Sequence, residues 1–190
     1  MVEWSIEALR AVPAVERIVV ALPPGVTAPP GTVGVPGGEQ RSQSVQAALR
    51  HASAEDDDVV IVHDAARPLV TAELVQDCLD TLLSEDCDAA IAATPVTDTI
   101  KESEGEEVVR TLDRTRLWAV QTPQVFHRAA LEDAFAQGEA AIAAATDDAS
   151  LVEAAGGTVR LVPAPRENLK VTTPEDLRLA DLLLRERAGQ

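Results

Sequence analysis

The sequence predicts an α/β fold in which a mostly parallel β-sheet carries helices on both faces. Two observations support this fold class. Apolar, β-branched runs alternate along the chain with segments of helical periodicity, as in βαβ units. The run at residues 58–63 is almost wholly apolar, which is typical of a parallel strand covered on both faces.

The expected strands are short and end at clear turn signals. The first, at residues 17–22, is followed by Pro23-Pro24-Gly25, which favours a turn. Residues 23–38 then hold five prolines and five glycines without a helical period, so we expect a loop there. The other expected strands are residues 58–63, 89–94 and 158–163.

Helices are expected between and after these strands. Thr71 is a candidate N-cap for one of them. Another begins at Thr173-Pro174-Glu175-Asp176, which provides a hydroxyl N-cap, a proline at the first position and acids near the positive dipole end. The expected helices cover residues 5–11, 43–51, 71–83, 131–136, 147–155 and 174–186.

Residues 96–126 interrupt this alternation. Three short strand-like pieces lie there around an acidic turn at residues 102–107, as in an antiparallel arm that projects from a domain. A chain of 190 residues is long enough for one domain with a full core. We therefore expect a single domain over residues 1–190, with residues 96–126 as its arm.

Charge narrows the classes of partner. The 32 acidic and 16 basic side chains give a net charge of −16, which repels nucleic acids and anionic membranes. An anionic substrate would need a local basic pocket. Glu3 and Glu7 stand where a signal peptide would carry basic and then apolar residues, and no apolar run approaches the ~20 residues of a membrane span, so the cytoplasm is the expected location.

The cysteines do not indicate a metal site. Cys78 and Cys87 have no third or fourth partner of the kind a zinc site needs, and the three histidines show no metal-binding spacing. We expect two reduced, buried thiols.

The strongest candidate site follows the strand at residues 58–63, in the motif HDAARP. Ligands of open α/β sheets bind beyond the carboxyl ends of the strands. Asp64 can ligate a magnesium ion or accept a sugar hydroxyl, and Arg67 can bind a phosphate through its planar guanidinium. Small Ala65 and Ala66 would let a ligand approach the backbone. The alternative is an Asp–Arg pair on the surface.

A second candidate is the glycine-rich loop that enters the helix at residues 43–51. Gly38 and Glu39 precede the helix start, where free backbone N–H groups and the helix dipole favour an anion or a polar base edge. The alternative is an ordinary cap, with Ser42 or Ser44 satisfying the helix alone.

Three further candidates carry hydroxyl, carboxylate or cationic groups. Thr146 opens the motif TDDAS at a helix start, which capping would also explain. Lys170, one of only two lysines, can neutralise a phosphate or remain solvated. Arg114, on the expected arm, can serve the active site of a neighbouring subunit or lie on the surface of a hairpin.

Taken together, the order and spacing of these motifs carry more information than any one of them. The series GG-x-x-R-x-x-S, HDAARP, DT-x-K, LDR-x-x-LW-x-x-QTPQ-x-F, TDDAS and N-x-KVT-x-PEDL resembles the 2-C-methyl-D-erythritol 4-phosphate cytidylyltransferase family over residues 2–184. The resemblance implies a Rossmann-like nucleotidyltransferase fold and a homodimer formed through the arm at residues 96–126. It also implies transfer of a cytidylyl group from CTP to methylerythritol phosphate, with Mg²⁺ or another divalent cation, in non-mevalonate isoprenoid biosynthesis.

The family pattern also implies a role for each candidate residue. The implied CTP-binding residues are Gly38, Glu39, Ser44, Asp64 and Ala65. The implied acceptor-binding residues are Arg67, Thr99, Arg114, Thr146 and Lys170. Of these residues, Asp64, Arg67 and Lys170 would carry catalysis, while Thr99 and Arg114 would reach across a dimer interface. No residue is assigned to a metal.

One motif of the family pattern has no match here. The family opens with a strand and a loop of the form A-A-G-x-G-x-R-x-x-x-x-x-x-K-Q, which cradles the triphosphate, whereas residues 1–7 match the helix that follows that loop. Losing one such electrostatic stabiliser typically costs ~10²–10³-fold in rate. We therefore expect these 190 residues alone to be weak or inactive, with two unpaired edges where the strand would lie mid-sheet.

The sequence bears on three other functions. A ribitol-phosphate cytidylyltransferase would need a similar basic pocket, although Ala66 within HDAARP favours methylerythritol phosphate. A non-catalytic remnant that only dimerises through residues 96–126 would not bind magnesium–CTP tightly. A dinucleotide-binding oxidoreductase would need G-x-G-x-x-G after a first strand, and the sequence contains no such motif.

Overall fold

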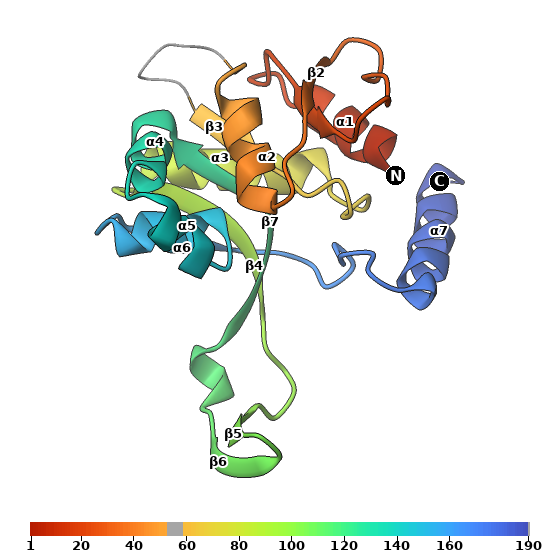
Figure 1. The fold of residues 1–190 in the computed structure, drawn as a ribbon. Helices are drawn as coiled ribbons and strands as arrows, with labels where there is room; N and C mark the ends of the chain where they lie inside the picture. Colours follow the sequence, from red (N-terminus) through yellow and green to blue (C-terminus); the bar gives the residue numbers. More distant parts are fainter. Residues whose placement is uncertain (53–58, 190) are drawn as a thin grey trace.

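A four-stranded mixed sheet lies at the centre of the computed structural model, which describes residues 1–52 and 59–189 (Figure 1). Its order is β3 (Val59–Val62), β7 (Trp118–His127), β4 (Ala89–Pro95) and β8 (Val159–Pro163). Strands β3, β4 and β8 run in one direction and β7 runs against both neighbours. The prediction of a mostly parallel sheet is wrong for β7, because the chain leaves the end of β4 into the arm and must return from that same end.

Strands β1 (Val19–Leu22) and β2 (Val33–Pro36) form a separate parallel pair. Strand β2 lies within residues 23–38, where the sequence predicted only loop. Val33 and Val35 alternate around Gly34, and the Val33 N–H donates to the Ile18 carbonyl at 2.9 Å. The surrounding prolines and glycines hid this short alternation in the sequence.

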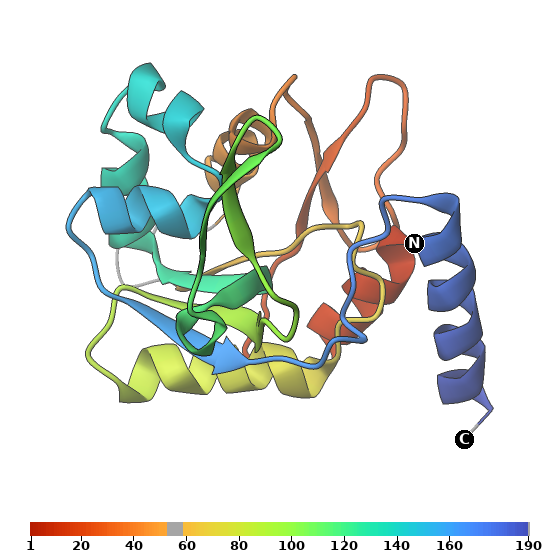
Figure 2. The same ribbon diagram turned by 90° about the horizontal axis from the view of Figure 1, so that it is seen from below.

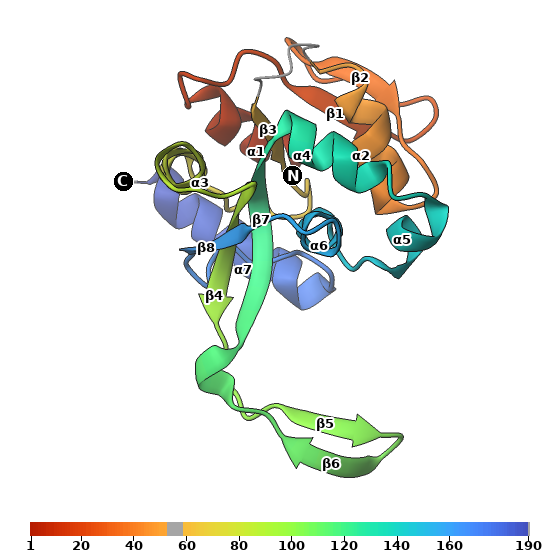
Figure 3. The ribbon, with the colours of Figure 1, turned by 90° about the vertical axis from the view of Figure 1, so that its left-hand side faces the viewer.

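Helices cover both faces of the sheet, as the sequence predicted (Figure 3). On one face lie α1 (Val2–Arg10) and α3 (Ala72–Ser84); on the other lie α2 (Arg41–Leu49), α4 (Arg128–Phe135) and α6 (Asp148–Ala154). Strand β4 serves both layers, since Ala90 and Ala92 pack with the α3 side and Ala89 and Ile91 with the α4 and α6 side.

Each predicted helix is present within a few residues, and so is each predicted strand in the described range. The Thr71 hydroxyl caps α3 by accepting a hydrogen bond from the Leu74 N–H at 3.2 Å. Helix α5 (Glu139–Ala144) was not predicted from its alanine-rich sequence. Asp58, the first residue of the strand predicted at 58–63, lies outside the described residues.

The arm leaves the domain as a hairpin of β5 (Lys101–Glu104) and β6 (Glu107–Thr111), followed by the 3₁₀ turn η1 (Arg114–Arg116) (Figures 1 and 3). Every residue of both hairpin strands is exposed. The projecting part is shorter than the predicted 96–126, because β7 begins at Trp118 and pairs with β4 from its first residue.

Helix α7 (Pro174–Ala188) lies to one side of the two layers (Figure 2). It begins with the predicted cap, in which the Thr173 hydroxyl accepts from the Asp176 N–H at 3.1 Å. The hydrogen bonds that Asp176 accepts from Thr172 and Thr173 lower its pKa to about 2. None of the helices in the described part of the chain is long and apolar enough to cross a membrane.

Both cysteines are free and buried, as predicted. Burial raises the pKa of the Cys78 thiol to about 12, so this thiol stays protonated and unreactive near neutral pH.

Candidate active site

A cavity of ≈ 390 Å³ opens beyond the carboxyl end of β3, beside β7 and the start of α6. Four predicted site residues line it together, although they are up to 106 positions apart in the sequence (170 minus 64). They are Asp64, Arg67, Thr146 and Lys170. Arg41, Thr122, Gln124 and Asp147 also line the cavity, and sequence reasoning gave none of these a role in binding or catalysis.

Asp64 lies between two cations. Its Oδ1 atom accepts from Arg41 Nε at 2.9 Å, and its Oδ2 atom lies 2.9 Å from Lys170 Nζ. Burial alone would raise the pKa of Asp64, but the hydrogen bonds and charges of Arg41 and Lys170 outweigh burial and hold this pKa below its usual value. Asp64 is therefore ionised at neutral pH.

Arg41 also contacts Asp148, the first residue of α6. Arg41 Nη1 lies 2.6 Å from Asp148 Oδ2, and Asp148 is only 1% exposed. Burial raises the pKa of Asp148, against the opposing effect of Arg41. Burial would lower the pKa of Arg41, but Asp148 and Asp64 raise it overall. Arg41 belongs to the motif GG-x-x-R and Asp148 to the motif TDDAS. Only the fold shows that these two residues are in contact.

Arg67 faces the cavity from the turn after β3. Its Nη1 donates to the Asn168 carbonyl at 2.9 Å, and burial lowers its pKa although Asp64 opposes this shift. The predicted alternative of an Asp64–Arg67 surface pair is wrong, because Asp64 pairs with Arg41 and Lys170 instead. The guanidinium of Arg67 is thus held by carbonyl groups rather than by a carboxylate.

Thr146 lines the cavity next to the cap of α6. The Asp147 carboxylate accepts from the Ser150 N–H at 2.9 Å and from Gln124 Nε2 at 2.7 Å. The capping alternative is therefore right for Asp147, whereas Asp148 pairs with Arg41.

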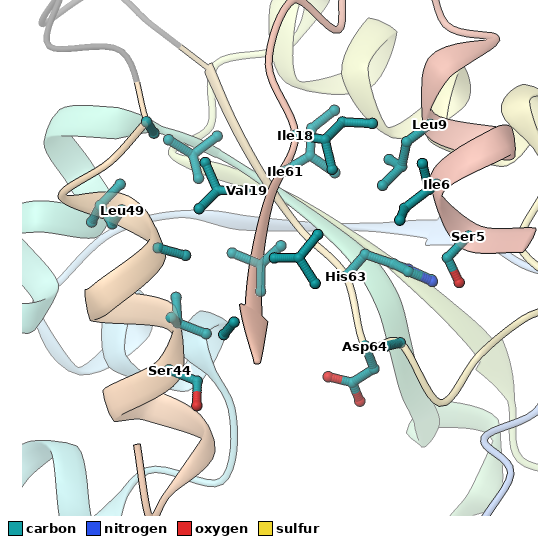
Figure 4. A pocket seen from close by; sticks show the side chains of 18 of the residues that line it. Ser5, Ile6, Leu9, Ile18, Val19, Ser44, Leu49, Ile61, His63 and Asp64 are labelled. Atoms are coloured by element: carbon teal, nitrogen blue, oxygen red, sulfur yellow. The ribbon is translucent and has the colours of Figure 1, made fainter. Parts of the chain in front are cut away.

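A second cavity, of ≈ 300 Å³, adjoins the first and contains the predicted residues Ser44, Asp64 and Ala65 in its lining (Figure 4). Its walls are mainly apolar side chains of α1, β1, α2 and β3. A third cavity, of ≈ 520 Å³, shares Ile18, Val19 and residues 59–61 with it.

We call the space between β1 and β3 the slot. In the described residues β1 pairs with β2 alone and β3 with β7 alone, so each strand turns an unpaired backbone edge toward it. The slot ends near Ser44 and Asp64 (Figure 4).

The glycine-rich loop before α2 is held by its own polar groups. The Gly38 N–H donates to Ser44 Oγ at 3.0 Å, and Gln40 rather than Ser42 or Ser44 is the N-cap of α2. A Cβ atom at Gly38 would lie 2.3 Å from the Gln43 Cβ, so only glycine fits there. Glu39 is exposed beside this loop and lines none of the three cavities.

Thr99 and Arg114 lie on the exposed arm and do not line these cavities. The structure therefore does not bring them to the site of their own chain. The expected contribution to the site of a second subunit stays a prediction.

The donor set does not form a metal cage. Within residues 1–52 and 59–189, no group of three or more His, Cys, Asp or Glu side chains is placed to hold a metal ion. The two aspartates that line the cavity are already engaged: Asp64 pairs with Arg41 and Lys170, and Asp147 accepts from Gln124. Asp148, next to Asp147, pairs with Arg41. Mg²⁺ commonly takes one or two protein carboxylates and completes its shell with phosphate oxygens and water, so a cation here would depend on oxygens of the ligand.

Cations and hydroxyls at the carboxyl ends of sheet strands define an α/β protein suited to an anionic, hydroxyl-bearing ligand. The chain belongs to the 2-C-methyl-D-erythritol 4-phosphate cytidylyltransferase (IspD) family, whose model matches residues 1–186.

Individual relatives agree with this assignment. A 2-C-methyl-D-erythritol 4-phosphate cytidylyltransferase of Rubrobacter xylanophilus is 48% identical over 154 residues, which are 80% of this chain and 66% of the relative. The enzyme of the same name from Bacillus licheniformis is 44% identical over 79% of this chain and 63% of its own length. The matched part thus spans about two thirds of these relatives. The crystal structure of the Thermus thermophilus enzyme superposes with a TM-score of 0.84 at 39% identity, covering 96% of this chain and 88% of that one.

His63 was not predicted as a site residue, although it precedes Asp64. Its Nε2 lies 3.2 Å from the Arg67 carbonyl and its Nδ1 lies 3.0 Å from the Thr122 hydroxyl. Burial lowers the pKa of His63 to about 4, so the ring is neutral in the folded protein at physiological pH.

We predict that acid destabilises the protein through His63. Between pH 6.5 and about 4 the unfolded chain protonates this histidine and the folded chain does not, so the free energy of unfolding should fall as the pH falls, by up to ~3 kcal/mol. Urea unfolding at several pH values measures this slope. His63→Gln should flatten it and His51→Gln, at the exposed end of α2, should not; equal slopes in all three proteins would contradict the prediction.

A second prediction concerns Lys170. Lys170→Met removes a hydrogen bond and a positive charge from Asp64, so the pKa of Asp64 should rise. NMR titration of the carboxyl carbons measures it. The matched control is Lys101→Met. It changes the only other lysine of the chain, which lies on the arm, and should leave the Asp64 titration unchanged. The lowered pKa of Asp64 contributes stability that is present above about pH 4 and is lost as the pH falls through this pKa. Because the shift is smaller in Lys170→Met, the free energy of unfolding of this variant should fall less between pH 7 and acid than that of the wild type.

Proposed function

We propose that the protein transfers a cytidylyl group from CTP to 2-C-methyl-D-erythritol 4-phosphate and releases pyrophosphate. A phosphate oxygen of the acceptor attacks the α-phosphorus of CTP in line. One P–O bond forms while the bond to the β-phosphate bridging oxygen breaks. The observation that carries this proposal is the cavity in which Asp64, Lys170 and Arg67 converge, in a chain of this family.

The residues of this cavity are suited to positioning and charge neutralisation. Asp64 holds the Lys170 ammonium in place, and Arg67 is oriented by the Asn168 carbonyl, so that both cations can hold the acceptor phosphate. Asp64 and Thr146 can also bond the acceptor hydroxyls. Fixing the phosphate oxygen against the α-phosphorus lowers the entropic part of the barrier, and charge neutralisation favours the transition state. Mg²⁺ held on the phosphates would neutralise the charge that develops on the leaving pyrophosphate.

We assign the nucleotide to the side of the site near α2. Ser44 and Ala65 line the cavity that adjoins Asp64, and the backbone of Gly38 is fixed against Ser44. Gly38, Glu39 and Ser44 would contact the cytosine end, and Asp64 and Ala65 would lie near the ribose.

We propose that two chains assemble through the arm and that each lends Thr99 and Arg114 to the site of the other. The fully exposed hairpin supports this assembly, since Val108 and Val109 are 55% and 53% exposed on it. The two free thiols are compatible with a reducing compartment, and we propose the cytoplasm.

We further propose that the slot takes one more strand, followed by a glycine-rich loop that binds the triphosphate. Unpaired edges on both sides, apolar walls and open space on both faces of the sheet support a strand at this position. Since the slot ends near Asp64, a loop that followed such a strand would emerge beside the candidate active site (Figure 4).

A third prediction tests the acceptor cation. In the active form of the protein, Arg67→Ala should lower kcat/KM for methylerythritol phosphate by ~10²-fold or more, with a smaller effect on KM for CTP. Pyrophosphate release measures it. Arg160→Ala, which removes an exposed arginine paired with Glu85, is the control. Faster turnover with ribitol phosphate than with methylerythritol phosphate would instead identify the alternative acceptor.

A fourth prediction tests the slot. The 190-residue chain should release pyrophosphate from CTP, magnesium and methylerythritol phosphate at least ~10²-fold more slowly than a form extended by the codons upstream in its gene. Lys170→Met in the extended form is the negative control. Equal activity of the short and extended forms would overturn the slot proposal, and inactivity of both would overturn the proposed function.

A further inference from the structure

Three chain segments that carry the site meet at one buried hydroxyl. Thr122 lies on β7 and is only 3% exposed. Its Oγ1 accepts from the Asp64 N–H at 3.0 Å and lies 3.0 Å from His63 Nδ1. Because the Arg67 carbonyl, which cannot donate, lies 3.2 Å from His63 Nε2, that nitrogen carries the ring proton and Nδ1 accepts from the Thr122 hydroxyl.

The backbone of Thr122 binds the third segment. Asn168, which is fully buried, donates through Nδ2 to the Thr122 carbonyl at 2.9 Å and to Gln121 Oε1 at 2.8 Å. The Asn168 carbonyl in turn accepts from Arg67 Nη1 at 2.9 Å. Lys170 follows two residues later, so Asn168 fixes the base of the loop that brings this lysine to Asp64.

We propose that Thr122 is a positioning residue of the reaction, whose hydroxyl sets the backbone at Asp64 and thereby the geometry in which this carboxylate holds Lys170. This inference rests on the proposed function of the site. Among the hydrogen bonds of the described residues, those of the Thr122 hydroxyl go to Asp64 and His63 and to none of the three cations. Its effect is exerted through the Asp64 N–H and the His63 ring, which are both left without their partner when the hydroxyl is removed.

A hydrophobic replacement of the same shape separates this role from packing. Thr122→Val keeps the volume and removes the hydroxyl, whereas Thr122→Ser keeps the hydroxyl and loses a methyl group. If the hydroxyl positions Asp64, the valine variant is defective and the serine variant is nearly normal; if Thr122 only fills space, this order is reversed. A misplacement of about 1 Å at a reacting group can cost ~10²-fold in rate.

Kinetics use whichever of the two forms compared above turns over faster, and NMR uses the 190-residue chain. Thr122→Val should lower kcat by ~10²-fold with KM for CTP changed less than ~3-fold, and Thr122→Ser should restore kcat to within ~5-fold of the wild type. Thr81→Val, which removes a hydroxyl bonded only within α3, is the matched control and should have wild-type kinetics. If Thr122→Val does not fold, as judged by circular dichroism, Thr122→Ala takes its place.

NMR of Asp64 tests the positioning role of Thr122 without relying on enzyme activity, so it can fail independently of the proposed function. Thr122→Val should raise the pKa of Asp64 and speed exchange of its amide hydrogen by ~10-fold or more, and Thr122→Ser should reverse both changes; these readouts need no turnover. An inactive wild type with these NMR changes would overturn the proposed function alone. Unchanged Asp64 signals in Thr122→Val, or a serine variant as defective as the valine variant, would overturn the positioning role.

Discussion

The ion pairs of Asp64 are the interaction on which the candidate site depends. Asp64 lies in the turn after β3, and its ion pairs connect this turn to Arg41 in α2 and to Lys170 in the loop after β8. These three segments are far apart in the sequence. Removing charged groups from water costs about as much free energy as their pairing returns, so such a network is weak evidence for stability. Its value lies in geometry: it holds an ammonium group at the cavity wall in a protein whose net charge is −16.

The sequence predicted the parts of the site that follow local patterns. The motif HDAARP directly after an apolar strand predicted that Asp64 and Arg67 lie at the carboxyl end of that strand. The clear helix start at Thr173 predicted that Lys170 lies in the loop before the last helix. The sequence could not show that Arg41, in α2, reaches both Asp64 and Asp148, since the contact with Asp148 joins residues 107 positions apart in the chain. In the same way, the sequence assigned residues up to 126 to the arm, and no local pattern showed that β7 runs back into the sheet between β3 and β4.

The slot connects the architecture to the site. Leaving the N–H and C=O groups of a strand edge without hydrogen-bond partners among apolar side chains costs free energy. A strand between β1 and β3 would satisfy both edges and join two separate sheets into one. Such a strand would also end where Ser44, Asp64 and Ala65 lie, so completing the sheet and completing the site are a single structural step.

The charge balance at the cavity gives an independent argument for that step. In the described part of the chain, Arg41 and Lys170 already pair with Asp64 and Asp148, and Arg67 is the cavity cation that no carboxylate holds. One acceptor phosphate can be balanced by Arg67 with the outer face of Lys170. A triphosphate cannot be balanced by the same two groups, because they are engaged by the acceptor. The donor therefore needs positive charge from elsewhere, and a divalent cation together with a basic loop above the slot would supply it beside the α-phosphate.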